Sequence, residues 1–171
     1  MIKQFKASYI SQEDRLMLRI STLKNEEIRL WLTRLLCIKF LTYSKNKSLA
    51  SLNSTHSVSN AKAIDNFKQE ALLLEPKQPS PFDLNLKLPL GPSPLLIHDI
   101  IVEDRTVNAQ KFYNITFNLQ TNQKLKYIIT DKDLDSIRML LSAVSAKANW
   151  TQIDRTNSSE PATSNQSHPI H

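Results

Sequence analysis

Hydrophobic and polar residues alternate with a period of two in two neighbouring stretches near the start of the chain. The apolar members are Leu16, Leu18, Ile20, Ile28, Leu30 and Leu32. Such alternation is typical of strands that bury one face. Asn25 lies between the stretches and tolerates the left-handed conformation that a short hairpin loop needs. The pattern predicts an antiparallel hairpin in which residues whose numbers sum to 48 lie opposite each other.

The same pattern returns 97 residues later, with Asn122 at the place of Asn25. Its apolar members are Tyr113, Ile115, Phe117, Leu125, Tyr127 and Ile129. Another alternating segment precedes each hairpin, Phe5–Ile10 in the first copy and Leu96–Val102 in the second. Each copy therefore predicts three strands followed by a helix.

The two helices have different patterns. After the second hairpin, Thr130 and Asp133 form a capping-box signature, and apolar residues then repeat at helical spacing. They are Leu134, Ile137, Leu141 and Val144. After the first hairpin, Thr33 holds the capping position, but the segment 35–41 is apolar on nearly all sides. We expect this first helix to need more cover than a sheet provides.

The segment between the copies divides into three parts. Residues 44–60 are polar and predict a linker, whereas 61–75 predict an amphipathic helix. Its apolar side, expected to cover the first helix, consists of Ile64, Phe67, Ala71 and Leu74. Six of the eight prolines lie within 76–94, which predicts an extended connector. Residues 151–171 are polar and predict a disordered tail.

The predicted fold class is therefore α+β. Two strand-strand-strand-helix units, residues 1–43 and 95–150, are expected to form one antiparallel sheet with the helices on one face. The inserted helix and the C-terminal tail complete the chain.

Composition excludes several classes of function. Gly91 is the single glycine, so no glycine-rich phosphate-binding loop can form. Cys37 is the single cysteine and predicts neither a disulfide nor a metal cluster. The chain starts without a secretory signal and lacks an apolar run of about 20 residues, so we expect a cytoplasmic protein. The sequence indicates no cofactor, no metal and no small-molecule ligand.

Candidate catalytic groups are sparse. Asp131, Asp133 and Asp135 are spaced like metal-binding carboxylates, but acids at the start of a helix are favoured by its dipole. His98 is the one histidine near a predicted strand, and we expect a structural role for it. We therefore expect no enzyme.

The formal charge of +6 lies in the first unit, because residues 1–50 hold ten Lys and Arg against four Asp and Glu. The predicted register places Arg19 opposite Arg29 on the outer face of the first hairpin, beside Met17 and Trp31. Two like charges in opposition are destabilising without a nearby anion. A nucleic-acid phosphate, Glu27, or a carboxylate from the inserted helix or from a partner protein would serve.

Two hypotheses about function follow. The surplus apolar surface of the first helix favours a non-enzymatic module that binds a protein partner or a second copy of itself. The alternative is a protein that binds single-stranded nucleic acid through a basic and aromatic sheet face. The candidate binding residues are Met17, Arg19, Arg29, Trp31 and Arg34.

Overall fold

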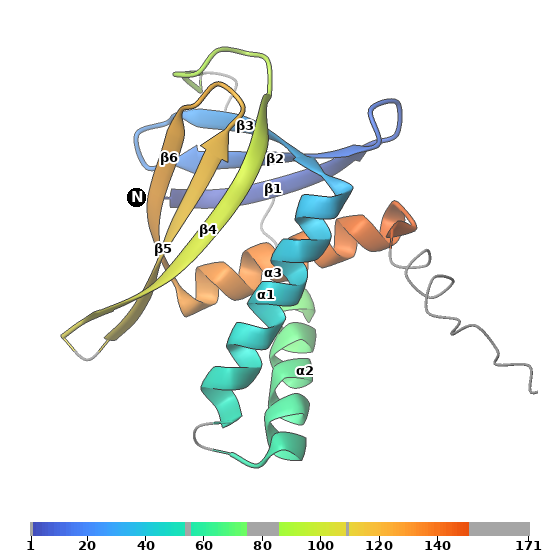
Figure 1. Ribbon diagram of the computed structural model, residues 1–171, viewed down its shortest axis with the longest axis vertical. Helices are drawn as coiled ribbons and strands as arrows, with labels where there is room; N and C mark the ends of the chain where they lie inside the picture. Colours follow the sequence, from blue (N-terminus) through green and yellow to red (C-terminus); the bar gives the residue numbers. More distant parts are fainter. Residues whose placement is uncertain (1, 54–55, 75–85, 109, 151–171) are drawn as a thin grey trace, which may run out of the picture.

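The computed structural model describes residues 2–53, 56–74, 86–108 and 110–150. Its strands are β1 (Ile2–Ile10), β2 (Arg15–Thr22), β3 (Glu27–Thr33), β4 (Leu95–Val107), β5 (Gln110–Leu119) and β6 (Lys124–Thr130). Its helices are α1 (Arg34–Asn53), α2 (Val58–Leu74) and α3 (Asp131–Lys147). This is an α+β fold, in which α1 and α2 lie between the two groups of strands in the sequence (Figure 1).

The six strands form one sheet in the order β1-β2-β3-β4-β5-β6. Its strand pairs are antiparallel except for β3 and β4, which are parallel. The prediction of a wholly antiparallel sheet was therefore wrong. The chain leaves β3 through two helices before it starts β4, and a crossover of this kind brings the next strand back in the same direction.

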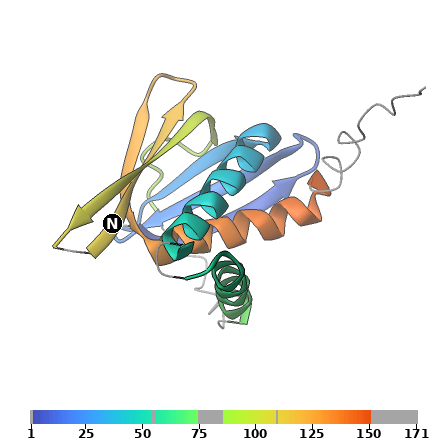
Figure 2. The ribbon, with the colours of Figure 1, turned by 60° about the horizontal axis from the view of Figure 1, so that its bottom comes forward.

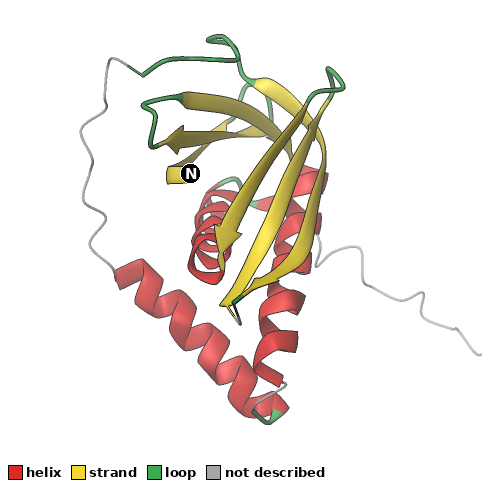
Figure 3. Ribbon diagram, turned by 90° about the vertical axis from the view of Figure 1, so that its left-hand side faces the viewer, coloured by secondary structure: helices red, strands yellow, loops and turns green. Residues whose placement is uncertain are grey.

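The contact between the two halves of the sheet is short. Leu30 pairs with Leu95 and Trp31 with Leu96, after which β4 leaves β3. The strands β4 to β6 then cross over those of β1 to β3 (Figures 1 and 3). In the described part of the chain, the edge of β4 that faces β3 is therefore not paired with a strand beyond Leu96. The helix α1 runs past this unpaired edge.

The predicted hairpin register is confirmed. Arg19 pairs with Arg29 and Met17 with Trp31, as the sum of 48 requires. Asn25 has a φ of 57° and Asn122 a φ of 61°, so both loops use Asn in the left-handed conformation. The two halves share their order of strands and helix, but an internal duplication stays a prediction.

One apolar core joins both halves. Buried side chains of β2, β3, β5 and β6 form a single cluster with residues of α1 and α3. Both helices lie across the same side of the sheet (Figure 2). The helix α3 packs on β1 as well as on β5 and β6, so the last helix holds the first strand in place. The opposite side of the sheet has no helix over it in the described part of the chain.

Residues 44–53 belong to α1, so the prediction of a linker over 44–60 was wrong for this part. Ser44 is buried in α1, and its hydroxyl donates to the carbonyl of Leu41 at 3.1 Å. Ser48, one turn further on, donates to Asp65 of α2 at 2.7 Å. Polar residues are compatible with a helix when they find such partners. As a result α1 extends beyond the sheet and forms a projecting hairpin with α2 (Figure 3).

The inserted helix exists but begins at Val58, and its predicted buried side was wrong. Phe67 is 71% exposed, Ala71 is exposed and Ile64 is only half-buried. Leu74 ends α2, and its side chain lies outside the described residues. Among the described side chains of α2, the buried ones are instead Ala61 and Asp65.

An ion pair explains this orientation of α2. Asp65 is 5% exposed, and its two carboxylate oxygens accept from Arg138 of α3 at 2.7 and 3.3 Å. The same guanidinium lies 3.3 Å from Asp135. A buried carboxylate without partners is costly, so the helix turns Asp65 rather than Phe67 toward its neighbours.

The remaining predictions have mixed outcomes. The capping box of Thr130 and Asp133 is confirmed, and residues 86–94 form the loop that leads into β4. The rest of the expected connector, 76–85, and the expected tail, 151–171, lie outside the described residues. None of the described helices is long and apolar enough to span a membrane.

Candidate functional site

The candidate site is the helix-free side of β1, β2 and β3, which we call the outer face. Two rows of side chains cross the three strands there. One row holds Lys6, Arg19 and Arg29, and the next holds Ser8, Met17 and Trp31. Neighbouring strands lie about 4.8 Å apart, so the basic row spans roughly 10 Å.

These residues share a face because side chains alternate along a strand. Leu16, Leu18 and Ile20 of β2 are fully buried in the core, whereas Met17 and Arg19 between them are half-buried. The outer face therefore follows from the same alternation that builds the core.

Glu27 provides the anion that the two arginines require. Its Oε1 lies 2.7 Å from Nε of Arg29 and 3.4 Å from Nε of Arg19. Glu27 is 3% exposed, and it reaches both groups because it lies on the outer face two residues before Arg29. Nη1 of Arg29 also donates to the carbonyl of Pro92 at 3.1 Å. The guanidinium groups are therefore held in place rather than extended into solvent.

The basic row brings three cationic side chains together. Lys6, Arg19 and Arg29 lie side by side on the three strands, and Glu27 contacts both Arg19 and Arg29. The Arg19 side chain is 21% exposed and that of Arg29 26%. Trp31 is half-buried in the next row. Cationic groups and an aromatic surface thus lie side by side on the helix-free side of the sheet.

Arg34 does not belong to this face. It starts α1, and its Nη2 donates to the carbonyl of Trp150 at 3.3 Å. The Trp150 indole is buried and donates to Asp14 at 3.0 Å. Hydrogen bonds from Trp150 and Tyr9 lower the pKa of the Asp14 carboxyl. Arg34 is part of a cluster that ties the end of α3 to the β1–β2 turn.

Sequence reasoning placed Met17, Arg19, Arg29 and Trp31 together correctly but missed Lys6. The signal was present in the loop of four residues between β1 and β2, because a tight connection pairs Ile10 with Arg15 and therefore Lys6 with Arg19. Glu27 was one of the anions considered, and it is the one that the structure places between the two arginines.

The acids at the start of α3 each have a structural partner. Asp133 caps the helix, Asp131 accepts a hydrogen bond from the Tyr113 hydroxyl, and Asp135 contacts Arg138. Burial, together with Asp131, raises the pKa of Tyr113. No group of three or more His, Cys, Asp and Glu is arranged to hold a metal within the ranges that the structure describes.

Comparisons with known proteins do not assign the chain to a family. No protein-family model matches it, and neither the curated proteins nor the solved structures include a match.

Proposed function

We propose that this protein binds single-stranded nucleic acid across the outer face, as a binding protein rather than an enzyme. The observation that carries the proposal is the basic row of Lys6, Arg19 and Arg29 beside Met17 and Trp31 on the helix-free side of the sheet. Proteins that bind single strands without sequence preference combine positive charge for the phosphates with aromatic rings on which bases stack.

Glu27 supports this proposal in a specific way. Because the Nε atoms of Arg19 and Arg29 both approach one carboxylate, the two side chains lose less conformational freedom when they meet a phosphate. The three cations of the row favour an anionic ligand, and the half-buried Trp31 lies in the next row. The face therefore supplies both the charge and the stacking surface.

Trp31 itself reports on binding. The chain has two tryptophans, and Trp150 is buried on the opposite side of the sheet. In a Trp150→Phe background, quenching of Trp31 fluorescence by a short oligothymidylate measures binding at this face alone. Trp31→Ala, followed by fluorescence anisotropy of a labelled oligonucleotide, is expected to weaken binding about 5- to 150-fold, the range of one stacked base.

A charge reversal tests the basic row. Lys6→Glu is expected to weaken binding strongly, whereas Lys62→Glu, an equal change of charge at an exposed position of α2, is not. If both variants weakened binding by the same factor, the interaction would be a nonspecific attraction by net charge. Absence of quenching at low salt would remove the proposal.

Self-association through α2 is a second candidate, favoured by one observation. Phe67 is 71% exposed between the exposed Ala63 and Ala71, one turn away on either side. In the apolar segment of α1 that first suggested this function, Cys37 and Phe40 are buried, whereas Leu35 is 64% exposed. Light scattering over a range of concentrations tests it: a dimer that Phe67→Asp dissociates supports self-association, and a strict monomer excludes it.

A further inference from the structure

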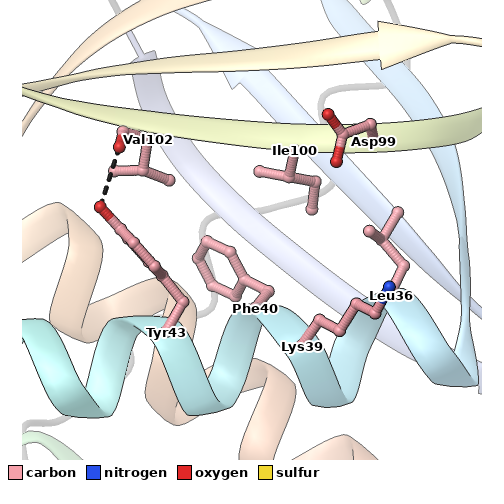
Figure 4. Close-up of a pocket in the computed structure, with 7 residues that line it drawn as sticks. All are labelled: Leu36, Lys39, Phe40, Tyr43, Asp99, Ile100 and Val102. Atoms are coloured by element: carbon pink, nitrogen blue, oxygen red, sulfur yellow. Dashed lines mark hydrogen bonds between the residues drawn. The ribbon is translucent and has the colours of Figure 1, made fainter.

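A cleft lies between α1 and β4, on the helix side of the sheet and away from the outer face. It follows from the opening of the sheet, because β4 leaves β3 after Leu96 and α1 runs along the exposed side of β4. The cleft has a volume of about 180 Å³ (Figure 4). It is lined by Leu36, Lys39, Phe40, Tyr43, Asp99, Ile100 and Val102.

One wall of the cleft comes from α1 and the other from β4. The residues from α1 are spaced by three, one and three positions, which places them on one side of the helix. On β4, the register against β5 shifts between Ile97 and Asp99, so a bulge precedes the residues of the cleft. Bulges often redirect the side chains that follow them. The Tyr43 hydroxyl donates to the carbonyl of Val102 at 2.9 Å and closes one end.

Opposite charges occupy the other end. Figure 4 shows the Lys39 amine on the helix wall and the Asp99 carboxylate on the strand wall, both toward the end at Leu36. Both residues are exposed, and within the described residues neither side chain has an ion pair or hydrogen bond. Between the charges and Tyr43, the cleft is apolar, with Phe40 below Ile100.

The size of the cleft limits the ligand. Sites for drug-sized molecules measure about 300–1,000 Å³. A cleft of about 180 Å³ is smaller than these sites and suits a ligand of roughly amino-acid size, such as leucine or phenylalanine.

We propose that this cleft binds a free α-amino acid with an apolar side chain. Lys39 pairs with the carboxylate of the ligand, Asp99 pairs with its ammonium group, and the apolar walls receive its side chain. A simple carboxylic acid would leave Asp99 facing an anion, and a simple amine would leave Lys39 facing a cation. A zwitterion pairs with both groups at once. The site is independent of the proposed nucleic-acid binding.

The test uses the full chain and amide NMR titration with L-leucine and L-phenylalanine. We expect shifts at Ile100 and Val102 and a Kd on the order of 0.1–1 mM, as for other ligands of this size. Isocaproate, which lacks the ammonium group, and isoamylamine, which lacks the carboxylate, are expected to bind at least tenfold more weakly. Absence of shifts at a ligand concentration of about 10 mM would overturn the proposal, since this concentration exceeds the expected Kd at least about tenfold.

Two variants test the proposed contacts of Lys39 and Asp99 with the ligand. Lys39→Met and Asp99→Asn are expected to weaken leucine binding at least tenfold each while the melting temperature is unchanged, because neither side chain has a partner in the described structure. Lys24→Met, in the β2–β3 turn, makes the same change of charge away from the cleft and should bind normally. Binding that survives both cleft variants, or isocaproate that binds as well as leucine, would show that no zwitterion site exists.

Discussion

The orientation of α2 gives the sharpest prediction about stability, because sequence pattern and structure disagree about it. The apolar spacing of α2 predicts that Phe67 is buried, so that Phe67→Asp would cost roughly 2–4 kcal/mol. The structure leaves Phe67 71% exposed and buries Asp65 against Arg138. We therefore expect Phe67→Asp to change the free energy of unfolding by no more than about 0.5 kcal/mol.

Asp65→Ala should have the large effect instead. Arg138 is 5% exposed and, among the described residues, would keep only Asp135, at 3.3 Å, and Gln69 near it. Removal of one partner of a buried ion pair costs about 3–5 kcal/mol. At the lower limit this lowers the melting temperature by roughly 6–12 °C, given about 2–4 °C per kcal/mol for a chain of this size.

Urea unfolding followed by circular dichroism measures both variants. A double variant, Asp65→Leu with Arg138→Met, is the matched control, because it removes both charges and leaves neither one buried alone. It should lose clearly less stability than Asp65→Ala. Hydrogen exchange should show the amides of α2 opening first in Asp65→Ala. If Phe67→Asp were the more damaging variant, the described orientation of α2 would be wrong.

Four further predictions concern single side chains. Asp65→Asn should lose stability at pH 7, and this loss should shrink as the pH falls below the ordinary carboxyl range. Burial raises the pKa of Asp65, but the hydrogen bonds from Arg138 and Ser48 outweigh it, so the net pKa is lowered and the stabilisation disappears when acid protonates the native carboxylate. Asp135→Asn should lose less stability at pH 7 than Asp65→Asn, because burial raises the pKa of Asp135 more than Arg138 lowers it. Urea unfolding at a series of pH values compares the two variants. Thr130→Ala should cost about 1 kcal/mol in urea unfolding through loss of the capping box. Cys37, whose pKa burial raises to about 12, should react with a thiol reagent only when the protein unfolds.

The strands could be predicted from the sequence because they depend on local signals. Alternation fixes which side of β2 and β3 is buried, and Asn25 fixes the loop, so the pairing of Arg19 with Arg29 follows without knowledge of the rest of the chain. The candidate face was predictable to the same extent, since it is the other side of the same alternation.

Features that depend on distant partners could not be predicted. The ion pair of Asp65 and Arg138 joins residues that are 73 positions apart, and it outweighs the apolar pattern of α2. The polar residues 44–53 extend α1 because partners such as Asp65 are available for Ser48. Arg34 bonds to Trp150, 116 positions away, and is thereby removed from the outer face.

The most direct test of the proposed function is the salt dependence of binding to a short oligothymidylate. For a single strand, the logarithm of the affinity falls by about 0.7 per phosphate contact for each unit in the logarithm of salt concentration. The three cations of the basic row predict a slope of about −2, and Lys6→Ala should reduce it by about 0.7. Lys62→Ala should leave it unchanged. A slope that is near zero, or that responds equally to both substitutions, would contradict binding across the outer face.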